Sequence, residues 1–177
     1  PALADLANHI GDRQVRARGT LGGSLANNDP AACYPSAALA LGATIVTNQR
    51  EIAADDFFVG MYTTALEEGE LITAVRFPIP RKASYQKFRQ GASRFALVGV
   101  FVAQTASGVR VAVTGAASSV FRQSALEAAL NQSFTAASAA AVKVDASDLG
   151  SDIHASPVYR AQLISVLTQR AVKQMLG

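Results

Sequence analysis

A glycine pair between two hydroxyl-bearing residues is the part of this chain best suited to chemistry: Thr20-Leu21-Gly22-Gly23-Ser24. Adjacent glycines can adopt positive φ, so successive backbone N–H groups can converge on one point. Such a concave site binds anions, and a nucleotide diphosphate is a common ligand for it. A tight turn that binds nothing is the alternative interpretation, because glycine pairs also occur in turns for conformational reasons alone.

Two familiar phosphate-binding motifs are absent from the sequence. There is no GxxxxGK[ST] segment, which excludes a P-loop for ATP or GTP. There is also no GxGxxG between a strand and a helix, so the ordinary dinucleotide-binding fold is not indicated. A phosphate at the glycine pair would therefore be held in another architecture.

The residues around the glycine pair carry a family resemblance. Residues 14–46, QVRARGTLGGSLANNDPAACYPSAALALGATIV, resemble the second glycine motif of the FAD-binding (medium) subunit of the molybdenum hydroxylases. The likeness spans essentially the whole chain and continues through Phe57-Phe58, Glu70-Leu71-Ile72, Phe77-Pro78 and Tyr85-Gln86-Lys87-Phe88. Leu97 stands where the xanthine dehydrogenases have a lysine, which favours the carbon monoxide dehydrogenase medium-chain type.

This resemblance implies an FAD site with no catalytic side chain and no metal ligand of its own. Backbone N–H groups and hydroxyls of the glycine motif would bind the FAD diphosphate. Asp29 would reach ribityl or ribose hydroxyls, Leu71 would touch the adenine side, and Phe95 would lie near the isoalloxazine. The implied cofactor-binding residues are thus Thr20, Leu21, Gly22, Gly23, Ser24, Asp29, Leu71 and Phe95.

Ordinary structural roles are the alternative for several residues of this region. Leu71 also fits a strand, Phe95 also fits a core, and Asn27-Asn28 also fits a turn. Cys33 stands where the family commonly has an aspartate, and we expect it to be a buried structural cysteine. Lys87 is expected to be a solvated strand residue rather than a cofactor contact.

The resemblance also implies an incomplete site. Members of the family carry an earlier glycine-rich segment, in an N-terminal subdomain, that also wraps the FAD diphosphate. No such segment occurs among these 177 residues. We therefore expect the chain to be the C-terminal portion of such a subunit, with half of the flavin site.

Composition narrows the remaining classes of function. Half of the residues are hydrophobic and 16% are charged, which is typical of a globular protein. The net charge is +3, and the basic residues are scattered rather than arranged in a stripe with aromatics, so nucleic-acid binding is not expected. No apolar run is long enough for a membrane span. The single cysteine, Cys33, cannot form an internal disulfide or ligate an iron–sulfur cluster, which favours a cytoplasmic location.

The hydrophobic pattern predicts an α+β chain in two parts. Residues 1–80 are expected to form the second FAD-binding subdomain, a mixed α/β unit with helices at 1–10 and 35–41 and strands at 43–47, 50–53 and 70–77. Residues 81–177 are expected to form the C-terminal domain of the flavin subunit. Its three-stranded antiparallel sheet would use residues 84–89, 95–102 and 109–114, with helices at 124–130, at 136–144 and from Ser156-Pro157 onward.

The implied function is that of an oxidoreductase subunit that is not active alone. Electrons would pass from [2Fe-2S] clusters of a small partner subunit through FAD to an acceptor, while a large molybdopterin subunit hydroxylates the substrate. The protein supplies binding and orientation in this scheme, and the cofactor supplies the redox chemistry. The alternative is a flavin-free scaffold or subunit-interaction module derived from the same family.

Overall fold

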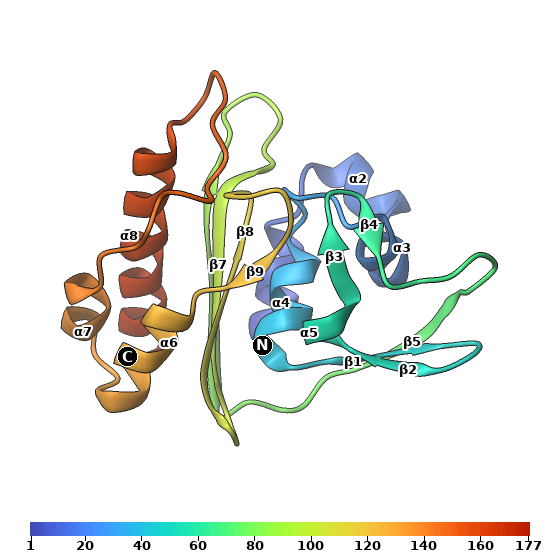
Figure 1. Ribbon diagram of the computed structural model, residues 1–177, viewed down its shortest axis with the longest axis horizontal. Coiled ribbons are helices and arrows are strands. Elements are labelled where there is room, and N and C mark those ends of the chain that lie inside the picture. Colours follow the sequence, from blue (N-terminus) through green and yellow to red (C-terminus); the bar gives the residue numbers. More distant parts are fainter.

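The computed structural model describes all of residues 1–177 and has a central antiparallel sheet with a layer packed on each face (Figure 1). The sheet has the strand order β6-β7-β8-β9, formed by Lys82–Arg89, Ala96–Thr105, Gly108–Thr114 and Phe121–Arg122. The expected antiparallel sheet of three strands is confirmed, and the short β9 adds a fourth strand that has too few residues to show any hydrophobic period.

Strand β7 divides the interior of the protein. It pairs with β6 through Tyr85 opposite Phe101 and with β8 through Phe101 opposite Ala112. Successive side chains of a strand point to opposite faces. Val100 and Val102 accordingly join the core beneath the C-terminal helices, whereas Phe101 joins the core beneath the N-terminal layer.

The C-terminal layer consists of three helices: α6 (Ser124–Gln132), α7 (Ala136–Ala141) and α8 (Pro157–Leu176). Ser156 caps α8 by accepting a hydrogen bond from the Tyr159 N–H, and Pro157 follows at the first helical position, as the sequence predicts. Leu163, Leu167, Ala171 and Met175 are buried against the sheet. Tyr159, in the first turn of α8, is 43% exposed.

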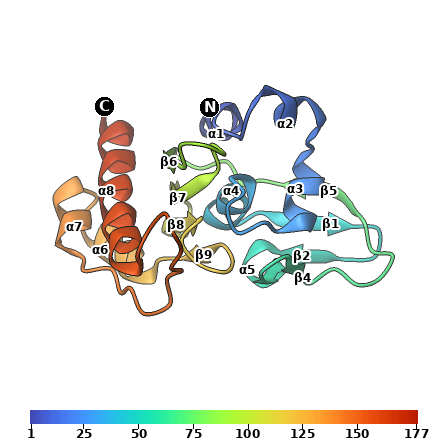
Figure 2. The same cartoon turned by 90° about the horizontal axis from the view of Figure 1, so that it is seen from above.

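The N-terminal layer covers the opposite face of the sheet (Figure 2). It contains α1 (Ala2–Asn8), α2 (Arg13–Arg18), α3 (Leu21–Asn27), α4 (Tyr34–Leu41) and α5 (Ala54–Phe57). It also contains the sheet β2-β1-β5, formed by Glu51–Ala53, Thr44–Thr47 and Ile72–Arg76, and the hairpin β3-β4, formed by Phe58–Gly60 and Thr63–Thr64. The predicted helices and strands are present here, and α2 and α3 are additional helices.

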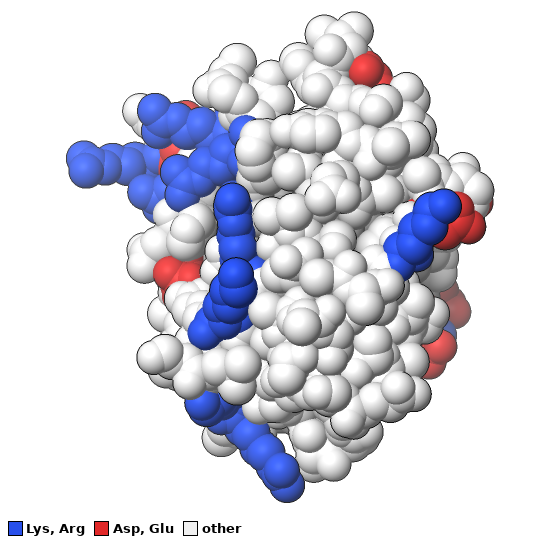
Figure 3. All heavy atoms as spheres, turned by 90° about the vertical axis from the view of Figure 1, so that its left-hand side faces the viewer, with Lys and Arg blue, Asp and Glu red and all other residues white.

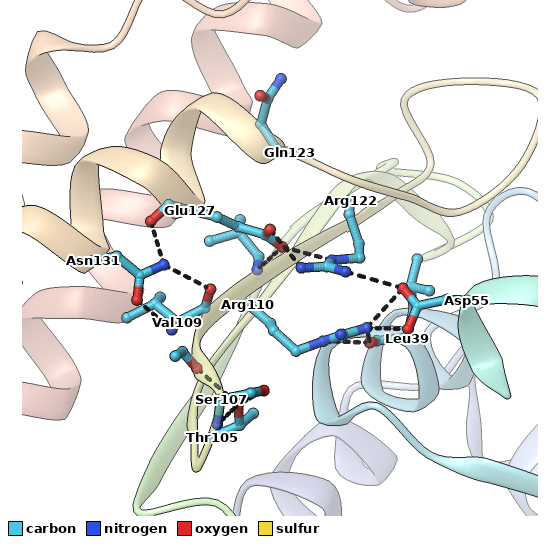
Figure 4. A network of polar contacts seen from close by, with 12 residues as sticks. Leu39, Asp55, Thr105, Ser107, Val109, Arg110, Arg122, Gln123, Glu127 and Asn131 are labelled. Carbon is cyan, nitrogen blue, oxygen red and sulfur yellow. Dashed lines mark hydrogen bonds and ion pairs between the residues drawn. The ribbon is translucent and has the colours of Figure 1, made fainter.

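An ion-pair network ties the N-terminal layer to the central sheet (Figure 4). Arg110 of β8 donates to both carboxylate oxygens of Asp55 in α5, at 2.8 and 2.7 Å, and to the Leu39 carbonyl. Arg122 of β9 bridges Asp55 and Glu127 of α6. One carboxylate therefore links two strands of the central sheet to the opposite layer.

None of the helices combines the length and the apolarity that crossing a bilayer requires.

Candidate functional site

The glycine motif begins a helix, not a turn. Thr20 is the N-cap of α3, and its Oγ1 accepts a hydrogen bond from the Gly23 N–H at 3.0 Å. Gly22 and Gly23 lie within the helix and are not among the glycines with positive φ. The predicted nest of left-handed glycines is therefore wrong. Thr20 starts a helix instead, because its side chain and its carbonyl accept hydrogen bonds from the N–H groups of Gly23 and Ser24.

The start of α3 still offers donors to an anion. The N–H groups of Leu21 and Gly22 have no acceptor within the protein, since only the Gly23 and Ser24 N–H groups reach Thr20. Gly23 is exposed, and a Cβ built on it would lie 2.9 Å from Thr20 Oγ1. A Cβ on Gly22 would instead point to Ile72, with ordinary contacts of 3.8 Å. The two glycines thus have different surroundings, and only Gly23 faces the open side.

A cavity of about 680 Å³ lies beside the start of α3. This volume is in the range of small-molecule and cofactor sites. Five of the residues expected at the site line it together, from α3 and its N-cap, the loop after α3 and the residue before β7: Thr20, Gly23, Ser24, Asp29 and Phe95. Residues separated by up to 75 positions in the sequence are therefore gathered at one wall.

Three expected site residues do not line the cavity. Leu21 packs on the small core of the N-terminal layer, and Gly22 lies against Ile72. Leu71 is 67% exposed, and its N–H donates to Asn48 Oδ1 at 2.8 Å. Leu71 immediately precedes β5 and is not among the residues that line the cavity.

Cys33 and Lys87 form the floor of the cavity. Cys33 is 4% exposed, in agreement with the expected buried cysteine. The Lys87 ammonium donates to the His9 carbonyl at 2.8 Å and to Cys33 Sγ at 3.3 Å. The expectation that Lys87 is solvated is therefore wrong: its ammonium is held between the ends of α1 and α4, and Lys87 is one of the residues that line the cavity.

Tyr85, two residues before Lys87, is buried beneath this floor. Its hydroxyl has no hydrogen-bond partner, and burial raises the pKa of Tyr85 well above its ordinary value. A Cβ on Gly99 of the neighbouring strand would lie 2.6 Å from that hydroxyl, so glycine leaves the space the ring occupies. Tyr85 is thus a neutral core residue.

The loop after α3 holds Asp29 at the cavity. Asn28 ends the helix with its backbone in the left-handed region, at φ 44°. Its side chain is fully buried and donates hydrogen bonds to the carbonyls of Gly60 and Thr63. This agrees with the structural role expected for Asn28. The Asp29 carboxylate accepts from the Ala31 N–H at 2.8 Å, which fixes the turn, and its residue lines the cavity wall.

Two arginines that are not among the expected site residues also line the cavity. Arg16 and Arg18 lie on α2, whose N-cap Asp12 accepts from the Val15 N–H at 2.9 Å. Arg16 is held by its bond to the Ile10 carbonyl, while Arg18 forms no ion pair. In the sequence, Asp12 followed by closely spaced arginines is the pattern of a capped helix at this place. The helix is too short to show an apolar period, so the pattern alone did not predict it.

Comparisons with known proteins show the family to which the chain belongs. Residues 1–80 match the family described as "FAD binding domain in molybdopterin dehydrogenase". The chain superposes on carbon monoxide dehydrogenase from Hydrogenophaga pseudoflava with a TM-score of 0.85 and 31% identity, covering 99% of this chain and 67% of that one. The chain belongs to the FAD-binding subunit family of the molybdenum hydroxylases.

Further members of the family extend the comparison. The medium subunit of nicotine 6-hydroxylase from Paenarthrobacter nicotinovorans is 38% identical over 186 residues, which cover 97% of this chain and 66% of that subunit. The medium chain of the Hydrogenophaga carbon monoxide dehydrogenase is 35% identical over 129 residues, or 66% of this chain and 45% of that one. The present chain therefore spans two thirds or less of the length of these two relatives.

Proposed function

We propose that the cavity beside α3 binds the diphosphate and adjoining parts of FAD, and that the chain serves as the flavin-binding part of a molybdenum-containing hydroxylase or dehydrogenase. The observation that carries the proposal is the shared wall of Thr20, Gly23, Ser24, Asp29 and Phe95. This wall combines hydroxyls, an exposed glycine, a carboxylate and an aromatic ring. The hydroxyls and the exposed glycine suit the phosphates of FAD, the carboxylate suits the ribityl hydroxyls, and the aromatic ring suits the isoalloxazine.

The residues present fit a diphosphate. The unpartnered N–H groups of Leu21 and Gly22 and the hydroxyls of Thr20 and Ser24 are donors at the start of a helix, where an anion is favoured. Arg18 adds positive charge at the same cavity. The exposed Gly23 lets a phosphate approach the backbone closely.

The remaining wall residues orient the rest of the cofactor. Asp29, fixed by its turn, accepts hydrogen bonds from hydroxyls, and Phe95, which is 40% exposed, offers a ring face to a flat ring system. Lys87 holds a positive charge at the floor. FAD, when bound, supplies the redox chemistry, so no catalytic side chain is required of this chain.

The wider assembly is part of the same proposal. Electrons would reach the flavin from [2Fe-2S] clusters of a small subunit and leave to an acceptor, and a large subunit would hold the molybdopterin. Support comes from the names of the relatives, which include medium subunits or chains of nicotine 6-hydroxylase and carbon monoxide dehydrogenase. We also propose that the chain divides into residues 1–80 and residues 81–177, and the family match to residues 1–80 supports this division. A location in the cytoplasm is proposed as well.

Flavin retention tests the proposed function. The purified chain is mixed with FAD, freed of excess by gel filtration, and its flavin absorbance is compared for the native protein and two glycine variants. We expect Gly23→Ala to weaken FAD binding by about tenfold, or about 1.4 kcal/mol, because the new methyl faces the ligand and crowds Thr20.

Gly22→Ala is the matched control. Its methyl points to Ile72 with room to spare, and alanine suits a helix better than glycine, so flavin retention is expected to match the native chain. A native chain that stays colourless at saturating FAD would contradict binding by this chain alone and favour the flavin-free scaffold. Equal flavin retention by both variants would contradict the proposal that the diphosphate binds at the start of α3.

A further inference from the structure

Positive charge without compensating acids gathers along one edge of the molecule. Strand β6 and helix α8 contain six Lys and Arg residues and no Asp or Glu, although the chain has 13 acidic residues. Six of the 16 basic residues thus lie on two neighbouring elements, and four of the six remain at the surface, because Lys87 turns into the cavity and Arg160 is buried in an ion pair with Asp152. Figure 3 shows Lys and Arg side chains in a band on this side of the protein, with few acids among them.

Ion pairing separates this edge from the rest of the protein. Each ion pair between an arginine and an acid involves Arg50, Arg76, Arg110, Arg122 or Arg160. Lys82 and Arg89 of β6 and Arg170 and Lys173 of α8 are exposed and form none. We call these four residues, with Phe88 and Tyr159, the basic edge.

Direct contacts make β6 and α8 one surface. Ser84 Oγ and Gln86 Nε2 donate to Gln174 Oε1 at 2.6 and 2.7 Å. Arg170 lies one helical turn before Gln174, on the same side of α8. Lys82 Nζ donates to the Met175 carbonyl at 2.6 Å. Lys82 of β6 therefore lies beside the C-terminal turns of α8, which carry Arg170 and Lys173, at the outer strand of the sheet.

An aromatic pair lies on the same edge. The rings of Phe88 and Tyr159 pack edge to face, with centroids 6.3 Å apart, and are 37% and 43% exposed. Aromatic and arginine side chains are enriched at the centres of protein interfaces. Because the two rings pack on each other at 90°, they do not offer the pair of free faces on which successive bases would stack.

Simpler explanations account for only parts of the edge. Lysine and arginine on an outer strand discourage pairing with another sheet, which would explain Lys82 and Arg89. A cation in the last turn of a helix complements the helix dipole, which would explain Lys173. Neither explains the exposed aromatic pair or Arg170, which has no acid on its own helix to pair with.

We propose that the basic edge is a docking surface for another protein whose complementary surface is rich in Asp and Glu. The aromatic pair provides apolar contact, and the surrounding cations steer and align the acidic partner. This surface is separate from the cavity beside α3, so the proposal does not depend on FAD binding.

Zero-length cross-linking of the complete protein, purified at low ionic strength with whatever it binds in its own cells, tests the proposal. A carbodiimide joins an amine to a carboxylate only when the two are in contact. We expect Lys82 and Lys173 to be joined to Asp or Glu of a different chain, and Lys143, exposed on the α7–α8 connection, to serve as the control outside the edge.

Charge reversal gives the second measurement. Arg170→Glu with Lys173→Glu is expected to weaken the association by about tenfold or more, while Lys143→Glu leaves it unchanged. Circular dichroism verifies that each variant is folded. Cross-links confined to this chain, or an unaffected association, would overturn the proposal.

Two other outcomes would also overturn it. Salt-sensitive retention of a single-stranded deoxythymidine oligonucleotide, lost in the double reversal, would make the occupant a nucleic acid. Self-association of the double reversal, with no partner lost, would mean that the charges only protect the β6 edge.

Discussion

Glu70 has a structural role that its sequence context does not indicate. It follows an acidic run that resembles a surface loop, yet it is 5% exposed. Its carboxylate accepts hydrogen bonds from Arg50, the Glu67 N–H and Thr47, and these bonds, led by that of Arg50, lower the pKa of Glu70 to about 2. Glu70 therefore closes the loop that leads into β5.

The pKa of Glu70 predicts how stability changes in acid. The unfolded chain binds a proton at Glu70 near pH 4.3, whereas the folded chain does so only near pH 2. The stabilising contribution is thus complete above about pH 4.3 and is lost as the pH falls toward 2. We expect Glu70→Gln to flatten this fall in urea unfolding measured between pH 5 and pH 2. Glu68→Gln, at an exposed position without such contacts, should leave the native slope.

At the scale of elements, α5 depends on a single carboxylate. Asp55 accepts from Arg110 of β8 and Arg122 of β9, and Arg110 is only 13% exposed at its side chain. Removing Asp55 leaves two guanidinium groups beside each other with less compensation. We expect Asp55→Ala to destabilise the protein by about 1–2 kcal/mol, since Asp55 itself is partly solvated.

Thermal and urea unfolding measure that effect, and Asp56 provides the comparison. Asp56 is exposed and forms no ion pair, so Asp56→Ala should change the free energy of unfolding by less than about 0.5 kcal/mol. Equal stability of the two variants would show that Asp55 does not hold the layers together.

At the scale of the whole molecule, one hydrophobic cluster crosses from the N-terminal layer into the central sheet. Leu6 and Leu39 of that layer pack in the same cluster as Tyr85, Phe101 and Ala112 of the sheet. The proposed division at residues 80 and 81 therefore separates parts that share a core. A shared core favours unfolding as one unit.

We accordingly expect a single cooperative unfolding transition. Near-ultraviolet circular dichroism and fluorescence of the tyrosines, which are distributed over both parts, should give coincident midpoints in urea. A variant with Leu39→Ala should shift both probes together, with a loss of about 2–5 kcal/mol. Two separated transitions would instead mean that the parts are independently stable domains.

The sequence alone determined much of the local structure. The alternation Val109, Val111, Val113 marked β8, and Ser156-Pro157 marked the first turn of α8, because strand pattern and helix caps are set by neighbouring residues. The sequence also carried the resemblance to the FAD-binding subunits. It did not reveal α2 or β9, which are too short to show a period, or α3, whose glycine pair indicated a turn.

Only the tertiary structure decided which residues meet. Thr20 and Phe95 share a cavity wall, Lys87 contacts Cys33, and Arg170 of α8 joins the edge of β6, all across long stretches of chain. It also replaced the expected glycine nest by a helix capped by Thr20. A period of two or 3.6 residues fixes which side of an element is apolar, but not which other element that side will contact. Such contacts depend on how the layers pack against the central sheet.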